Sequence, residues 1–194
     1  MKPAHLFDAG WRIFFLAAGI WALVSIAVWM LWLAGLAGGA GHLGVAPQLW
    51  HAHEMIVGYA TAAMGGFFLT AVPNWTGAKA APARFVMLVS GLWLAGRLAV
   101  CLTGVLPPLL VALVDLAFLP VLAAKILTQL LARPEPQNLM FLVLISLLWS
   151  ANLMVHLDWM GLTATGWQGL RGGLLTVCAM IAALGGRVTP AFTR

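Results

Sequence analysis

The sequence predicts an all-α, polytopic membrane protein: a bundle of six transmembrane helices. Of its 194 residues, 63% are hydrophobic and only 8% are charged, whereas about a quarter of the residues are charged in an ordinary soluble domain. The apolar residues fall into long runs, close to the ~20 residues that a helix needs to cross a bilayer. This composition excludes a soluble domain and makes the lipid bilayer the first expected partner.

The first three spans begin near the N-terminus. The first apolar run is longer than a signal-peptide core, which has roughly 7–15 residues, so we interpret it as a retained span. A glycine-rich turn ending at Pro47 precedes the second run, and the polar loop 73–84 precedes the third. The predicted spans are 13–36, 50–72 and 85–106.

The last three spans follow the same rule. Two prolines at 107–108 predict a tight turn after the third span, and the polar linker 132–138 separates the fourth span from the fifth. A glycine pair at 185–186 predicts the end of the last helix. These spans are 109–131, 139–157 and 167–184, and the whole chain, 1–194, is predicted to form one membrane domain.

The basic residues predict the orientation. Most of them flank one side of the predicted bundle, and cytoplasmic loops carry the excess of lysine and arginine. Both termini are therefore expected to be cytoplasmic. The formal charge of +5 reflects this topology, so we expect no nucleic-acid partner. The flanking residues are Lys2, Arg12, Lys79, Arg84, Lys125, Arg133, Arg187 and Arg194.

The second span carries the most unusual residues. It opens with His51, His53 and Glu54, and ionisable groups inside a span are costly unless they are used or paired. At about 100° per residue, His51 shares a face with Glu54, Met55 and Gly58, whereas His53 points nearly opposite. The two histidines therefore serve different neighbours, or the first turn is unwound.

Arg97 and Asp115 lie at matched depth. The helical rise places both about 12–15 Å from the outer turn between their spans, and a buried arginine requires a partner. The spacing therefore predicts an ion pair. In an alternative interpretation, Arg97 also faces an anionic ligand group such as a haem propionate, which guanidinium binds in a bidentate manner.

Asn152 and His156 lie four residues apart on one face near the outer end of the fifth span. His51, His53 and His156 together place three imidazoles at one membrane level, an arrangement suited to haem or copper. Glu54 could hold a histidine tautomer, and the thioether of Met55 suits Cu(I). In the alternative, His156 hydrogen-bonds Asn152, and Glu54 accepts hydrogen bonds from Trp50 or Arg171.

Several stretches resemble the NnrS family of bacterial membrane proteins. They are WHAHEMIVGYATAAMGGFFLTAVPNWTG at 50–77, RIFFLAAGIWA at 12–22, Asp115 within its apolar span, ANLMVHL at 151–157 and GGRVTPAFTR at 185–194. The resemblance implies an inner-membrane protein that contains haem and copper and is associated with denitrification and nitric oxide stress. Family members are usually about twice as long, so the resemblance covers their N-terminal half, and a second copy of this chain is an expected partner.

The leading functional hypothesis is a haem b protein of nitrosative-stress tolerance. The haem is expected near the outer face on His51, His53 or His156, with Arg97 at a propionate. Nitric oxide or a metal–nitrosyl species would be the compound bound, and no reaction is assigned. A carrier or channel for a metal ion or small solute is one alternative, although the inner halves of the spans are almost entirely apolar. A cofactor-free assembly subunit is the other.

Overall fold

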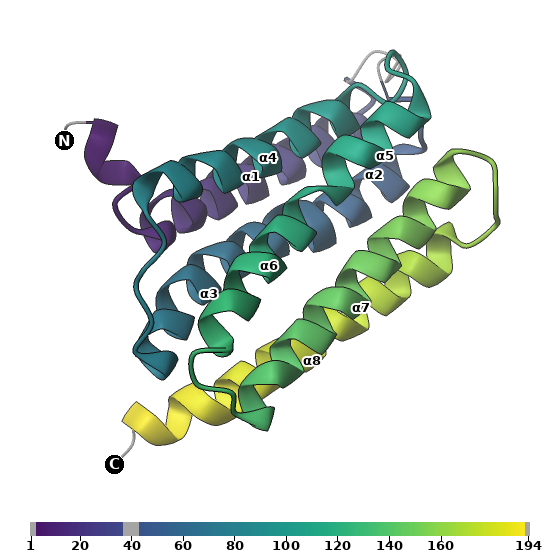
Figure 1. Ribbon diagram of the computed structural model, residues 1–194. Helices are drawn as coiled ribbons and strands as arrows, with labels where there is room; N and C mark the ends of the chain where they lie inside the picture. The colour runs from purple at the N-terminus through teal and green to yellow at the C-terminus, as the bar shows by residue number, and fades with distance from the viewer. Residues whose placement is uncertain (1–2, 37–42, 193–194) are drawn as a thin grey trace.

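The computed structural model describes residues 3–36 and 43–192. Within these ranges six helical spans are long and apolar enough to cross a membrane, which confirms the predicted all-α bundle (Figure 1). The glycine-rich turn at 37–42 lies outside the described residues. A short 3₁₀ helix, Pro3–Leu6, precedes the first span. The spans comprise α1 (Gly10–Leu33), α2 with α3 (Pro47–Thr76), α4 (Ala83–Cys101), α5 with α6 (Pro108–Leu130), α7 (Pro136–Trp159) and α8 (Gly166–Phe192).

The second span is the centre of the bundle. In its most apolar stretch 61% of the residues are buried, against 22–44% in the other spans. It consists of α2 (Pro47–His53), a π-helical segment (Glu54–Tyr59) and α3 (Ala60–Thr76). Helix α3 packs against α1 on one side and α6 on another. The histidine-containing stretch is thus surrounded by protein rather than lipid.

The fourth span is interrupted, where the sequence predicts one helix. Helix α5 (Pro108–Leu116) is followed by the single residue Ala117 and then by α6 (Phe118–Leu130). Pro120 has no N–H to donate to the carbonyl of Leu116, four residues earlier. The indole Nε1 of Trp149 on α7 donates to that carbonyl at 3.0 Å. The tryptophan therefore satisfies the acceptor that the proline leaves open.

The ends of the helices follow local sequence signals, with one exception. Prolines occupy the first turn of α2, α5 and α7, where a missing N–H costs nothing. Gly77 ends α3 in the left-handed conformation, at φ 68°. The prediction that the glycine pair 185–186 ends the last helix is wrong, because α8 continues to Phe192. Arg187 instead donates to Asn138 Oδ1 of α7 at 2.6 Å, which holds this end of α8 against its neighbour.

Two apolar clusters enclose a polar layer. The larger includes Phe68, Leu122 and Ile145, and the smaller is built on Trp50, Val100 and Val111. Residues one helical turn from the smaller cluster, on the same helices, are charged. Both described ends of the chain lie at one end of the bundle, and the loops 102–107 and 160–165 lie at the other (Figure 1). The polar layer is nearer to those loops.

Candidate metal centre

A buried polar cluster joins four of the spans. Its members are at most 4% exposed although each carries a charge, an imidazole or an amide. They come from the junction of α2 with the π-helical segment, from α4, from α5 and from α7. The cluster consists of His53, Glu54, Arg97, Asp115, Asn152 and His156.

Arg97 forms ion pairs with two carboxylates. Its Nη1 lies 2.9 Å from both oxygens of Glu54, and its Nη2 pairs with Asp115 Oδ1. A buried charge without a partner costs several kcal/mol, so each carboxylate stabilises the guanidinium. The Arg97–Asp115 pair expected from the sequence is present. Because Glu54 occupies the other side of the guanidinium, Arg97 in this structure binds protein carboxylates rather than facing an open ligand site.

Glu54 also accepts a hydrogen bond from a tryptophan, a donor that the sequence did not indicate. The indole Nε1 of Trp21 on α1 donates to Glu54 Oε2 at 2.6 Å, so Glu54 accepts from Trp21 and Arg97 rather than from Trp50 or Arg171. Trp93 of α4 donates to the carbonyl of Gly58 at 2.9 Å, within the π-helical segment. Tryptophans are common interface anchors in membrane proteins, so the sequence alone does not predict that Trp21 and Trp93 are hydrogen-bond donors inside the bundle. Gly58 was the one sequence feature that could have indicated these contacts, because a glycine leaves room for a large side chain from a neighbouring helix.

His53 is held by oxygen atoms on both sides. Its Nδ1 lies 2.9 Å from Glu54 Oε1, and its Nε2 lies 2.9 Å from Asn152 Oδ1. The amide of Asn152 is oriented by its Nδ2, which donates to Asp115 Oδ2 at 2.8 Å. Both partners of His53 are therefore acceptors, and both ring nitrogens donate. A ring that donates from both nitrogens carries one positive charge, which balances the second carboxylate.

His156 completes the group from α7. Its Nε2 lies 2.8 Å from Asp115 Oδ2, and its ring meets that of His53 edge-on, with centroids 5.7 Å apart. Trp159 contacts both rings, at 5.0 and 5.2 Å between centroids. The expected hydrogen bond between Asn152 and His156 is not the one formed. Asn152 turns instead to His53 and Asp115, since His53 provides a donor for its amide oxygen and Asp115 an acceptor for its amide nitrogen.

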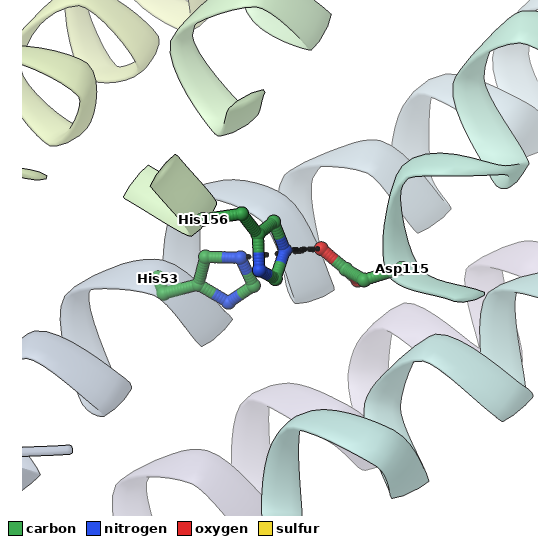
Figure 2. A group of neighbouring side chains, drawn as sticks. All are labelled: His53, Asp115 and His156. Carbon is green, nitrogen blue, oxygen red and sulfur yellow. Dashed lines mark hydrogen bonds and ion pairs between the residues drawn. The ribbon is translucent and has the colours of Figure 1, made fainter. Parts of the chain in front are cut away.

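His53, Asp115 and His156 have the geometry of a metal site. Each offers one ligand atom, and these atoms all lie within 4.8 Å of one another. Figure 2 shows both imidazoles directed at the carboxylate of Asp115. Bonds from zinc-like ions to imidazole and carboxylate are about 2 Å long, so small side-chain movements would bring the three atoms around one ion. The set supplies two nitrogens and one oxygen, which suits a transition metal.

His51 stands apart from this group. Its ring is half-buried and stacks on Trp29 of α1 at 4.9 Å, and its Nδ1 lies 3.3 Å from the carbonyl oxygen of Ser25. The structure thus confirms that the two histidines serve different neighbours. Met55 is half-buried and is not a member of the metal-ligand group. Glu54, predicted on the face of His51, pairs with His53 instead, because the π-helical segment alters the helical phase at this point.

Of the three histidines, only His51 has surroundings that fit a haem ligand. His53 is 0% exposed and His156 is 1% exposed, and the hydrogen-bonded nitrogens of both face protein oxygens, so neither ring can reach a porphyrin without opening the cluster. His51 fits better. A carbonyl can only accept, so Nδ1 of His51 donates to the carbonyl of Ser25, and in the neutral imidazole this leaves the lone pair on Nε2. A backbone carbonyl that fixes the tautomer is a common support for a metal-binding histidine.

A comparison with protein-family models gave a match. A family model described as NnrS protein matches residues 5–194, which is essentially the whole chain. Neither the curated proteins nor the solved structures gave a match. The matched range contains every residue of the buried cluster.

Proposed function

Because the chain belongs to the NnrS family, we propose that it is a multi-pass protein of the bacterial inner membrane that acts in nitric oxide tolerance as a metalloprotein. One observation carries the proposal: two imidazoles and a carboxylate meet within 4.8 Å inside the bundle. Such groups are expensive to bury in a membrane protein and usually mark a functional site. The compound handled is nitric oxide or a metal–nitrosyl species.

Copper is the ion that we assign to His53, Asp115 and His156. Imidazole nitrogen is among the ligands that copper prefers, and affinities of nitrogen and oxygen sites for divalent first-row metals peak at copper. Glu54 and Asn152 support the site by orienting His53. Replacing a residue that orients a metal ligand in this way typically lowers metal affinity 10–100-fold. Arg97 keeps both carboxylates in place.

We assign haem b to His51, whose hydrogen bond to Ser25 and half-buried ring would suit an iron ligand. When bound, the haem would supply an iron that binds nitric oxide. The chain's own contribution is to hold Nδ1 of His51 at the Ser25 carbonyl and the ring against Trp29. A second copy of this chain is the proposed protein partner.

The test is to measure metal content and visible absorption of the detergent-purified protein. Spectra of the oxidised and reduced protein, before and after nitric oxide is added, are compared with copper and iron per chain. We expect a Soret band that shifts with nitric oxide. His51→Ala should lose haem and keep copper, whereas His53→Ala and His156→Ala should lose copper and keep haem.

His5→Ala is the matched control, because this histidine has a 58% exposed side chain and should change neither metal. Full copper and haem in all three test variants would show that the ligand assignment is wrong. A wild-type protein that binds neither metal would overturn the proposal and favour a cofactor-free assembly subunit.

A further inference from the structure

We propose that the groove between α1 and α4 binds an anionic phospholipid, with an acyl chain in the groove and the phosphate at Arg84. The groove lies on the lipid-facing surface of the bundle. The proposal therefore goes beyond the proposed function and does not depend on a metal in the buried cluster.

The groove runs along two parallel helices. Both α1 and α4 begin at the end of the bundle where the described chain begins and ends (Figure 1). The groove has a volume of about 440 Å³, within the ~300–1,000 Å³ of typical ligand pockets. Its walls are residues from 13–24 of α1 and 87–94 of α4. Leu16 and Leu94 on its rim are 50% and 47% exposed, so the groove is open to the hydrocarbon.

The floor of the groove is apolar. Trp21 and Trp93 meet there edge-on, with ring centroids 5.9 Å apart. Both indole N–H groups donate into the bundle, to Glu54 and to the carbonyl of Gly58. The hydroxyl of Ser90, also in the lining, donates to a carbonyl of its own helix at 3.1 Å. The described lining thus offers no free side-chain donor, and a hydrocarbon chain is the complementary occupant.

The length of the groove matches one leaflet of a bilayer. At about 1.5 Å per residue, positions 13–24 of α1 rise by roughly 16 Å. A hydrocarbon core of ~30 Å gives each leaflet about 15 Å. The groove also begins just after the first turn of α1 (Gly10–Leu33) and ends near the middle of that helix. It therefore covers the depth that an acyl chain of the nearer leaflet occupies.

An unpaired cation stands at the mouth of the groove. Arg84 lies in the first turn of α4, seven positions before Gly91 of the groove wall, and this spacing keeps both on one helix face. Its side chain is exposed, and its guanidinium has no hydrogen bond or ion pair with any residue that the structure describes. Guanidinium binds phosphate in a bidentate manner. Arg12 in the first turn of α1 adds a second positive charge, which favours a lipid of net negative charge.

The groove between α1 and α8 lacks an unpaired cation on its second wall. Phe15 and Met180 are among the residues that line it. At the corresponding end of α8, Arg187 donates to Asn138 Oδ1 at 2.6 Å and lies over the ring of Trp75. That guanidinium is already bound within the protein, so the α1–α4 groove is the one matched to an anionic headgroup.

The experiment measures lipid binding to the delipidated full-length protein in detergent by native mass spectrometry. Anionic dioleoylphosphatidylglycerol is compared with zwitterionic dioleoylphosphatidylcholine, which has the same chains, and with glycerol phosphate, which has none. We expect the anionic lipid to bind about tenfold more tightly than the zwitterionic one, and glycerol phosphate not to bind.

Two variants separate the headgroup from the chain. Arg84→Gln should lower affinity for phosphatidylglycerol about tenfold and leave that for phosphatidylcholine unchanged. Gly91→Leu should weaken binding of both lipids, because nothing lies within 4 Å of a Cβ at this position and the longer side chain would fill the groove. Arg84 is exposed and unpaired, so Arg84→Gln tests the proposal even if Gly91→Leu does not fold.

Arg171→Gln and Gly19→Leu are the matched controls. Arg171 is an exposed arginine near the opposite end of the bundle, and Gly19 is an exposed glycine of α1 outside the groove lining with nothing within 4 Å of its added Cβ. Both variants should bind lipid as the wild type does.

Equal affinities for the two phospholipids, or an unchanged affinity for phosphatidylglycerol in Arg84→Gln, would overturn the inference. Binding of glycerol phosphate as tight as that of the lipid would also overturn it and indicate a site for free phosphate. None of these results depends on metal content, so the proposed function is tested separately.

Discussion

Asp115 is the residue through which the cluster is connected. Its Oδ1 pairs with Arg97 of α4, and its Oδ2 accepts from Asn152 and His156 of α7. The same oxygen lies 3.4 Å from His53 Nε2. One carboxylate on α5 thus contacts three other segments. Its removal would leave a guanidinium and two imidazoles without their shared partner.

Asp115→Asn should therefore be strongly destabilising. Breaking a buried ion pair by removing one partner costs about 3–5 kcal/mol, and the free energy of unfolding should fall by that amount. The measurement is SDS-induced unfolding in mixed micelles, followed by tryptophan fluorescence.

Asp8→Asn makes the same chemical change at the surface. The Asp8 side chain is 51% exposed and pairs with His5 at 3.0 Å, and exposed pairs contribute about 0–1 kcal/mol. Equal losses for the two variants would show that burial of the Asp115 network does not stabilise the bundle.

At the scale of elements, the decisive contact is that between α1 and the π-helical segment. Gly58 lies where Trp21 crosses from α1 to reach Glu54. A Cβ at this position would lie 2.5 Å from Trp21 Nε1 and 2.7 Å from Glu54 Oε2. Glycine is required here because the side chains of Trp21 and Glu54 occupy the space that a Cβ would need, and small residues permit such close packing in membrane bundles.

Gly58→Ala should lower the free energy of unfolding by about 1–3 kcal/mol, the usual cost of overpacking a core. It should also displace Trp21 from Glu54, which a blue or red shift of tryptophan emission would report. Gly91→Ala on α4 is the control, because nothing lies within 4 Å of its added Cβ. Alanine is the better helix former by about 1 kcal/mol, so this variant should be unchanged or more stable. An unchanged free energy of unfolding in Gly58→Ala would contradict the close contact between Trp21 and Gly58.

At the scale of the whole molecule, an even number of spans places the described ends of the chain at one end of the bundle (Figure 1). The connections from α3 to α4 and from α6 to α7 are also at this end (Figure 1). Lys79 and Arg84 belong to the first connection and the first turn after it, and Arg133 belongs to the second, so the positive-inside rule predicts that this end is cytoplasmic. The buried cluster, near the opposite end, would then lie toward the outer face of the membrane.

Reporter fusions test this orientation. A fluorescent protein at the C-terminus and one inserted in loop 77–82 should both fluoresce, while alkaline phosphatase in loop 160–165 should be active. Alkaline phosphatase in loop 77–82 is the control and should be inactive. Phosphatase activity at both loops would contradict a single orientation, and the reverse pattern would invert it.

The sequence alone determined the class of protein and the depth of its polar residues. Bilayer thickness sets the length of each apolar run, so the number of spans follows from hydropathy. The cost of a lone buried charge made a partner for Arg97 necessary, and Asp115 was the residue at matching depth. Separate surroundings for His51 and His53 were one of two predicted alternatives, because residues two apart in a helix point to nearly opposite faces.

Only the tertiary structure decided which groups meet. The π-helical segment at Glu54–Tyr59 changes the direction of every side chain around it, so Glu54 pairs with His53 rather than sharing the face of His51. The rotation of α1 and α7 about their own axes brings Trp21 to Glu54 and Asn152 to His53. Hydropathy carries no information on such rotations, because lipid and a packed apolar neighbour favour the same side chains. The partners of each polar group therefore depend on helix packing.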